Sequence, residues 1–221
     1  MKVKFAVIVF PGSNCDHDAL YSLKNNLNIE AGFVWHRESS LEGYDAILIP
    51  GGFSYGDYLR TGAIARFSPI MKSIIKESNK GTPIIGICNG FQILLESGLL
   101  TGALINNKKI KFLSKQVSLE VVSNNSIFSN KMNKGDVLEM PIAHREGNYT
   151  ASQDVLDALK KENRIIFKYK NNPNGSALNI GGIINKKGNV LGMMPHPERA
   201  CDKILGSDDG RKIFESMIGG I

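Results

Sequence analysis

Three short apolar runs, each ending directly in a glycine-containing turn, constrain the fold of this chain most. The runs are Val3 to Phe10, Ala46 to Ile49 and Ile84 to Ile87. They are continuously apolar rather than alternating, which is typical of strands that are buried on both faces of a parallel sheet. Helical patterns lie between them, so strand, loop and helix repeat along the chain. The sequence therefore predicts an α/β fold with a mostly parallel central sheet.

The other expected elements are also apolar runs or helical patterns that are bounded by turns. Further strands are expected at 31–35, 165–169, 180–184 and 190–194, and helices at 16–27, 62–78, 91–97, 154–161 and 208–217. Asp16 is expected to cap the first helix. From 117 to 142 the runs are short and broken by Asn- and Lys-containing turns, which predicts antiparallel strands added to the sheet. No linker or repeat interrupts residues 1–221, so we expect a single domain.

Composition excludes several classes of function. The formal net charge of +6 invites a nucleic-acid interpretation, but the basic residues are scattered over 221 residues and no nucleic-acid-binding motif accompanies them. The densest cluster, at 108–115, alternates with apolar residues. It is interpreted as a solvated lysine-rich face, with docking onto an acidic protein or ligand surface as the alternative. We therefore expect no nucleic-acid partner.

The sequence also argues against membrane, disulfide and metal-site classes. No apolar run reaches the roughly 20 residues of a membrane span, and Met1 to Phe10 lacks the cleavage site of a signal peptide, so it is interpreted as a strand. The three cysteines lack CxxC spacing, so neither a disulfide framework nor a metal site is expected. These features favour a cytoplasmic protein without membrane contacts.

Cys88 is the candidate nucleophile. It follows the apolar run 84–87 and lies between Gly86 and Gly90. Small residues at these two positions permit a sharp strand-to-helix turn, as in a nucleophile elbow. The thiol would then lie at a helix N-terminus, whose partial positive charge favours the thiolate. The N–H of Asn89 would face the same space as a donor to an oxyanion. The alternative is a buried structural cysteine.

A nucleophilic cysteine needs a base, and the chain has four histidines. His17 and His36 are expected at the surface. His144 lies in a second candidate site, Pro141 to Gly147. His196 follows the run 190–194 between two prolines, and Glu198 could turn back onto its imidazole. A carboxylate on one ring nitrogen would fix the tautomer and stabilise the imidazolium. A turn without a reactive partner remains the alternative for His196.

The loop after the run 46–49 is the third candidate element. It reads Pro50-Gly51-Gly52-Phe53-Ser54-Tyr55-Gly56-Asp57. Glycines at the end of a strand let the backbone approach a ligand closely. Beside Cys88, Gly52 or Phe53 would supply the second oxyanion donor. A turn without functional consequence is the alternative.

These segments carry a resemblance to a known family. The stretch Gly86-Ile87-Cys88-Asn89-Gly90-Phe91-Gln92 together with His196-Pro197-Glu198 resembles the class I, or triad, glutamine amidotransferases. The runs at 10–16, 51–60, 172–176 and 192–199 are similar to the branch that supplies the glutaminase subunit of phosphoribosylformylglycinamidine synthases. The resemblance covers residues 3–217. Arg145 and Asn179 depart from the family pattern, outside the triad.

The resemblance implies a fold and a set of site residues. It implies a flavodoxin-like three-layer sandwich. It also implies that Cys88, His196 and Glu198 hydrolyse L-glutamine through a thioester to glutamate and ammonia, and that Gln92 and Gly51 bind glutamine. His144, Arg145 and Glu146 are expected on the partner-facing side of the site.

The resemblance also implies a division of labour between chains. No phosphate-binding loop is present in the sequence, so no cofactor is expected on this chain. ATP and Mg²⁺ are expected on a large synthase subunit, with a small accessory subunit completing a hetero-oligomer that serves purine biosynthesis. Ammonia would pass internally to the large subunit, which converts formylglycinamide ribonucleotide to the formylglycinamidine.

Other functions remain open from the sequence. One is a stand-alone cysteine hydrolase of the same architecture, which the pair His196 and Glu198 disfavours. Another is a binding module without catalysis, which the intact Cys, His and Glu set disfavours. The third is a glutaminase subunit of an anthranilate, GMP or carbamoyl-phosphate type of amidotransferase, which the 51–57 stretch disfavours.

Overall fold

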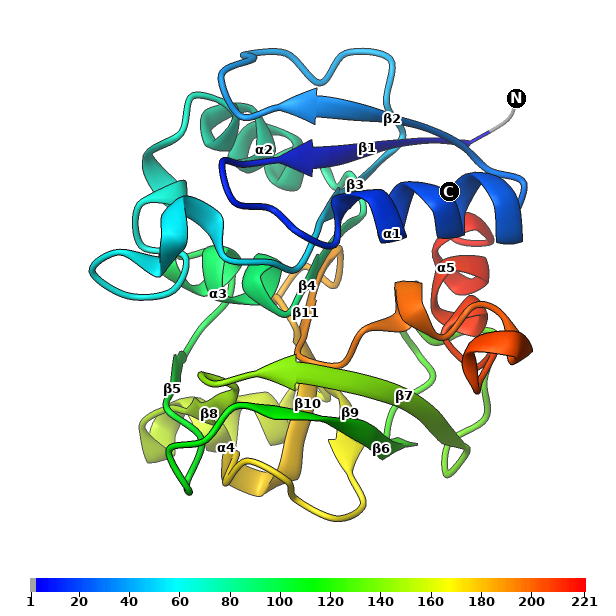
Figure 1. Ribbon diagram of the computed structural model, residues 1–221. Coiled ribbons are helices and arrows are strands. Elements are labelled where there is room, and N and C mark those ends of the chain that lie inside the picture. Colours follow the sequence, from blue (N-terminus) through cyan, green and yellow to red (C-terminus); the bar gives the residue numbers. More distant parts are fainter. Residues whose placement is uncertain (1–2) are drawn as a thin grey trace.

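The computed structural model describes residues 3–221, so Met1 and Lys2 of the expected first strand lie outside it. Within these described residues, nine strands form one mixed sheet in the order β2-β1-β3-β4-β11-β10-β9-β6-β7 (Figure 1). The strands are β1 Lys4–Val9, β2 Glu30–Trp35, β3 Ala46–Ile49, β4 Ile84–Ile87, β6 Leu113–Val121, β7 Val137–His144, β9 Ile165–Tyr169, β10 Ile180–Ile184 and β11 Val190–Met193. The predicted α/β class, a mostly parallel core with added antiparallel strands, is confirmed.

The parallel half contains β2, β1, β3, β4 and β11. Its strands β1, β3, β4 and β11 are almost entirely apolar and buried, which explains the continuous apolar runs in the sequence. Helices cover both faces: α1 (Asp16–Tyr21) and α5 (Arg211–Ile218) lie on one side, and α2 (Ile70–Lys80) and α3 (Asn89–Glu96) on the other (Figure 1). This arrangement is the predicted three-layer sandwich.

The antiparallel half extends the sheet from β11 through β10, β9, β6 and β7. The predicted antiparallel strands within 117–142 are confirmed as parts of β6 and β7, which pair over eight residue positions. Helix α4 (Gln153–Lys161) precedes β9, and a separate small sheet joins β5 (Ala103–Ile105) to β8 (Asn148–Thr150).

Three local predictions are wrong for identifiable reasons. The helix expected from Gly62 begins only at Ile70, because Gly62 has a left-handed φ of +77° and Pro69 precedes the first helical residue. Cys15 rather than Asp16 is the N-cap of α1, and the Asp16 carboxylate accepts a bond from the next backbone N–H. His36 is buried rather than exposed, because its ring packs against Phe10 and Tyr55.

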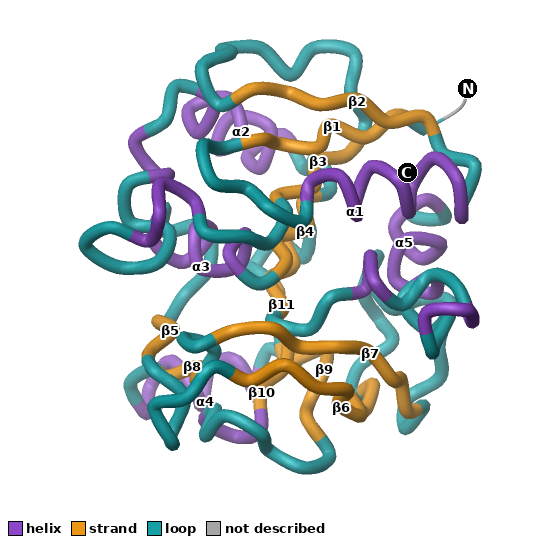
Figure 2. The backbone as a smooth tube through the Cα atoms, viewed as in Figure 1, coloured by secondary structure: helices purple, strands orange, loops and turns teal. Residues whose placement is uncertain are grey.

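Strands β1, β3, β4 and β11 pair in parallel, so their carboxyl ends meet at one edge of the sheet. Figure 2 traces the loops that join the strands to the helices. The loops after β1, β3, β4 and β11 carry Cys15, Gly51, Cys88 and His196 to this edge. In open α/β sheets this edge is the usual position of a ligand site. Separately, among residues 3–221 no helix is both long and apolar enough to span a membrane.

Gly90 is required where α3 approaches β3. A Cβ placed on Gly90 would lie 2.0 Å from the carbonyl oxygen of Ile49, which is a backbone atom and cannot rotate away. We expect Gly90→Ala to lower the free energy of unfolding by about 1–3 kcal/mol, as overpacked cores do.

The matched control is Gly32→Ala, whose three nearest neighbours all belong to the Tyr44 side chain, the hydroxyl oxygen at 3.1 Å being the nearest. This is the far end of a side chain that can move. Denaturant unfolding of both variants measures the difference. Equal destabilisation by the two substitutions would contradict this steric account.

Candidate active site

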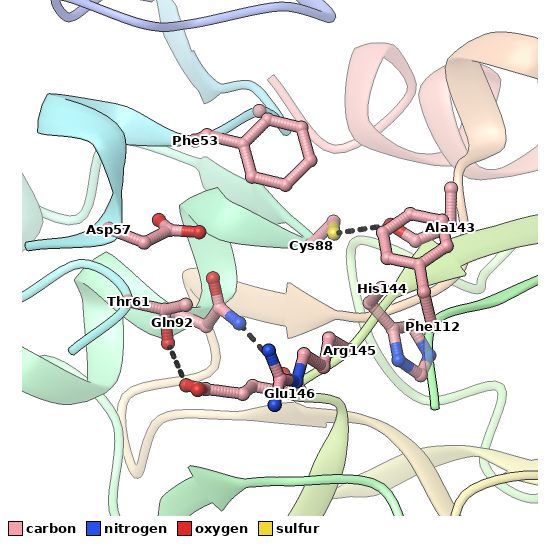
Figure 3. Close-up of a pocket in the computed structure, with 11 residues that line it drawn as sticks. Phe53, Asp57, Thr61, Cys88, Gln92, Phe112, Ala143, His144, Arg145 and Glu146 are labelled. Carbon is pink, nitrogen blue, oxygen red and sulfur yellow. Dashed lines mark hydrogen bonds between the residues drawn. The ribbon is translucent and has the colours of Figure 1, made fainter. Parts of the chain in front are cut away.

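Cys88 lies at the junction of β4 and α3 as an elbow. Its φ is 51° and its ψ is −105°, a conformation that costs on the order of 1–3 kcal/mol for a residue with a side chain. Glycine is needed on both sides, because a Cβ on Gly86 would lie 2.7 Å from the backbone of Gly90. Cys88 is the N-cap residue of α3, and its thiol donates to the Ala143 carbonyl at 3.6 Å (Figure 3). The strained turn therefore directs the sulfur out of the sheet, at the positive end of the helix dipole.

His196 and Glu198 lie beside Cys88 as a buried pair. The Glu198 Oε1 is 2.5 Å from Nδ1 of His196, and both side chains are almost fully buried. The His196 N–H donates to the Pro141 carbonyl at 2.9 Å, which fixes this segment to β7. Burial alone would lower the pKa of His196, but the Glu198 carboxylate and the neighbouring thiols outweigh it, so this pKa lies well above its ordinary value. The imidazole is thus prepared to hold a proton.

The sequence offers Gly52 or Phe53 in the glycine loop after β3 as an oxyanion donor, and the structure argues against Phe53. The backbone N–H of Phe53 donates to the Gly12 carbonyl at 3.0 Å, so it does not face the pocket as an oxyanion donor. The expectation for Phe53 is therefore wrong. Gly52 and Ser13 form the non-hydrogen-bonded pair of an antiparallel bridge, so the Gly52 N–H points away from Ser13. Position 52 requires glycine, because its φ is +140° and a Cβ there would lie 2.5 Å from the backbone nitrogen of Asn14. Gly52 and Asn89 remain the candidate donors.

A pocket of about 370 Å³ opens beside the Cys88 sulfur (Figure 3). Its walls come from the loop after β3, the start of α3 and the end of β7. The lining residues are Gly52, Phe53, Asp57, Thr61, Cys88, Gln92, Phe112, Ala143, His144, Arg145 and Glu146. The pocket does not include Gly51, which lies beside Cys88 and His196 instead. The volume suits a ligand of amino-acid size.

A chain of hydrogen bonds fixes the floor of the pocket. Gln92 donates to the Glu146 carbonyl at 2.7 Å, and its Oε1 accepts from Asn89 at 2.9 Å. Thr61 donates to the Glu146 carboxylate at 2.9 Å (Figure 3). Gln92 therefore lies in the pocket in a fixed orientation, and its role in binding glutamine stays a prediction.

Asp57 adds a second carboxylate that sequence reasoning missed. Its Oδ1 is buried and has no partner among the described residues, and burial together with the nearby Glu146 raises its pKa to about 6. A carboxylate held without a counter-charge in a ligand-sized pocket points to a cationic group in the ligand. The signal was available in the sequence, because Asp57 belongs to the 51–60 stretch that carries the resemblance.

The three residues expected to face a partner do not share one environment. His144 is only 3% exposed, and burial, with the charge of His196, lowers its pKa to about 4. Its ring packs against Gly147 and lines the pocket, and its expected place on the partner-facing side of the site stays a prediction. Glu146 is half-buried and bonded to Thr61, whereas Arg145 is exposed at the pocket.

Cys15 is the other residue of the site that sequence reasoning missed. It lies within a second, smaller cavity of about 70 Å³ that Cys88, His196 and Arg199 also line. The Arg199 Nη2 is 3.2 Å from its Sγ. Desolvation raises the pKa of Cys15, and burial raises that of the more remote Cys201 to about 12.

Comparison with known proteins decides the family. A family model for the CobB/CobQ-like glutamine amidotransferase domain matches residues 2–212. The chain belongs to this family. It is 44% identical to a chain of PurLQS from Thermotoga maritima, over 100% of this chain and 99% of that one, with a TM-score of 0.92.

Two more distant structures share the fold. A protein described as a GMP synthase subunit, from Thermoplasma acidophilum, has 18% identity and a TM-score of 0.67, over 99% of this chain and 94% of that one. A glutamine amidotransferase from Thermotoga maritima has 18% identity and a TM-score of 0.58, over 98% and 90%. The α/β architecture is therefore that of glutamine amidotransferases.

The environments of the three cysteines predict that an alkylating reagent reacts with Cys88 first. We expect iodoacetamide at neutral pH to alkylate Cys88 at least about tenfold faster than Cys15 or Cys201, because the raised pKa values of the last two leave little thiolate. Peptide mass spectrometry over a time course measures the three rates. The Cys88→Ser chain is the control and should lose the fast phase; equal rates at all three cysteines would refute the assignment.

Proposed function

We propose that this chain is the glutaminase subunit of a phosphoribosylformylglycinamidine synthase. The observation that carries the proposal is the convergence of Cys88, His196 and Glu198 at one end of an amino-acid-sized pocket. Membership of the glutamine amidotransferase family and 44% identity to a PurLQS chain support it. The 51–60 stretch supports this branch over other amidotransferases.

The proposed reaction begins at the Cys88 thiolate. It attacks the side-chain amide carbon of glutamine, and the Gly52 and Asn89 N–H groups hold the oxyanion; one such donor contributes roughly 10²–10³ in rate. His196 protonates the departing ammonia, since an amide nitrogen cannot leave as an anion. His196 then removes a proton from water, which hydrolyses the thioester to glutamate. Glu198 holds the imidazole tautomer throughout.

The pocket orients glutamine through its charged end. We assign the α-ammonium to Asp57 and to the carboxylate of Glu146, with Gln92 as a neutral partner of the α-carboxylate end. Arg145, exposed at the same pocket, supplies a positive charge near that carboxylate. The side-chain amide then extends towards Cys88. Gly51 contributes by leaving room between the catalytic residues rather than by binding glutamine.

The released ammonia is proposed to be used on another chain. Free ammonia is protonated at neutral pH and the ammonium ion is not nucleophilic, so transfer within an assembly is required. We propose a large synthase subunit that binds ATP and Mg²⁺, and a small accessory subunit, in a cytoplasmic complex for purine biosynthesis. The family match and the likeness to a PurLQS chain support a hetero-oligomer.

The decisive experiment separates the two nitrogen sources. In the assembled synthase, Cys88→Ser should lower glutamine-dependent turnover by about 10⁴-fold or more, as losses of a nucleophile do. Turnover with ammonium salts should stay within about twofold, because ammonia bypasses the thioester. Cys201→Ser, at a buried cysteine outside the pocket, is the control. An equal loss of turnover with glutamine and with ammonium in Cys88→Ser would refute the proposed function.

The raised pKa of Asp57 predicts a pH effect on glutamine binding. Asp57 is ionised above about pH 6 and becomes neutral below it, so its attraction for the α-ammonium is present at pH 7 and lost as the pH falls through 6. We expect KM for glutamine to rise below pH 6. Asp57→Asn should raise KM roughly ten- to hundredfold at pH 7.5, the range of a charged hydrogen bond, and remove this pH dependence.

A substrate analogue without the α-amino group tests the contact between Asp57 and the α-ammonium of glutamine. Asp57→Asn should bind glutaramate, which lacks the α-amino group, as the unaltered chain does. The control is Asp157→Asn, on the exposed face of α4, which should change neither KM. If Asp57→Asn raised KM equally for glutamine and for glutaramate, the assignment of the α-ammonium to Asp57 would be contradicted.

A further inference from the structure

Three residues of the pocket loop after β3 have a strained backbone. Tyr55, Asp57 and Leu59 have positive φ values of 54°, 55° and 70°. Residues with a side chain rarely adopt this left-handed region, and they keep it only where surrounding contacts impose it. Asp57 belongs to this segment, and Figure 3 shows its carboxylate directed into the pocket. The segment therefore needs a contact that holds its conformation.

The Asp57 side chain does not supply that contact itself. Its Oδ1 is buried and has no hydrogen-bond partner among residues 3–221. The two residues that follow, Tyr58 and Leu59, are 75% and 89% exposed, so their side chains fix the loop little. The residue before it, Gly56, has no side chain. The nearest side chain that can hold Asp57 in place is therefore that of Tyr55.

The Tyr55 hydroxyl is bound on two sides. It lies 2.8 Å from Nδ1 of His36 and 2.8 Å from Oγ of Ser68, and both of these residues are buried. The rings of Tyr55 and His36 also meet edge to face, with their centroids 5.6 Å apart. We propose that this hydroxyl anchors the strained segment, so that Tyr55 is a positioning residue that directs Asp57 at the α-ammonium of glutamine. The proposal rests on the proposed function, in which Asp57 binds that group.

The partners of the hydroxyl are tied to the central sheet and to α2. The His36 N–H donates to the carbonyl of Val9, the last residue of β1, at 2.9 Å. The His36 carbonyl accepts from the N–H of Ile70, the first residue of α2, at 3.1 Å. Ser68 lies two residues before the same helix. Buried polar networks of this kind rigidify the structure around them, so the hydroxyl connects the pocket loop to the packed framework.

The first part of the loop is held separately, by backbone hydrogen bonds. The Phe53 N–H donates to the Gly12 carbonyl at 3.0 Å, and the Tyr55 N–H donates to the carbonyl of Pro11 at 2.6 Å. These bonds do not involve the phenol, so removing the hydroxyl should leave Gly52 in place. We therefore expect the hydroxyl to affect binding of the α-amino end of glutamine and not the chemistry at the thiol.

The first test compares Tyr55→Phe with Tyr58→Phe in the assembled synthase. Each variant loses one phenolic hydroxyl of the same loop, and Tyr58 is the exposed control. Tyr55→Phe should raise KM for glutamine at least about threefold, the range of one hydrogen bond, and keep kcat within about twofold. Tyr58→Phe should change neither. An equal rise of KM in the two variants would overturn the proposal.

Glutaramate separates positioning of Asp57 from a general loosening of the pocket. Because this analogue lacks the α-amino group, its KM should be the same in Tyr55→Phe and in the unaltered chain. If Tyr55→Phe raised KM equally for glutamine and for glutaramate, the hydroxyl would have only a structural role and the proposal would fail.

A double variant tests whether Tyr55 acts through Asp57. Residues that act through one another have non-additive effects, so adding Tyr55→Phe to Asp57→Asn should change KM for glutamine by less than about twofold. If the two substitutions instead multiplied their separate effects on KM, Tyr55 would act independently of Asp57 and the positioning role would be refuted.

Hydrogen exchange of the full chain tests the anchor without glutamine. Peptides that cover 54–60 should exchange at least about threefold faster in Tyr55→Phe than in Tyr58→Phe or the unaltered chain, because the segment opens more easily. Unchanged exchange would refute the anchor, and faster exchange with an unchanged KM for glutamine would refute its role in binding. A chain whose exchange responds as expected but that fails the nitrogen-source test would keep the anchor and refute only the proposed function.

Discussion

The close approach of α3 to β3 is the contact on which the site depends. Gly90 lies so near the Ile49 carbonyl, and Gly86 so near Gly90, that neither position admits a side chain. This contact forces Cys88 into a backbone conformation that an unsupported cysteine would avoid. The surrounding packing maintains this strained conformation. Because of it, the sulfur points out of the sheet at a helix N-terminus. The candidate nucleophile is thus placed by the packing of backbone against backbone.

The second half of the sheet serves the same edge. Strand β11 pairs with β4 in parallel, so His196 is delivered next to Cys88, and the hydrogen bond from His196 to Pro141 ties it to β7. Strand β7 also brings the Ala143 carbonyl to the Cys88 sulfur and carries the pocket wall at its end. The antiparallel extension therefore does more than cover the core. It supplies one wall of the pocket and the support for the imidazole.

The sequence predicted the features that are local. Strands such as β3, β4, β9 and β10 were predicted at their observed bounds, because apolar runs and glycine turns are short-range signals. The elbow at Cys88 and the pairing of Glu198 with His196 were likewise expected from adjacent residues. The late start of α2 has local causes, Gly62 and Pro69. The other features that sequence reasoning missed depend on distant contacts: the burial of His36, the direction of the Phe53 N–H, and the approach of Cys15 to His196. No pattern along the chain encodes these, because each is set by a neighbour from a distant loop or turn.

The parallel pairing of β4 with β11 also has a consequence for synthesis on the ribosome. Strands β1 to β4 are all translated before residue 90, and they can pair early because they are close in sequence. The imidazole partner of Cys88 emerges more than one hundred residues later. A nascent chain therefore contains the Cys88 thiol without its base while these intervening residues are synthesised. The site is complete only after β11 has inserted between β4 and β10, when the two reactive groups first meet.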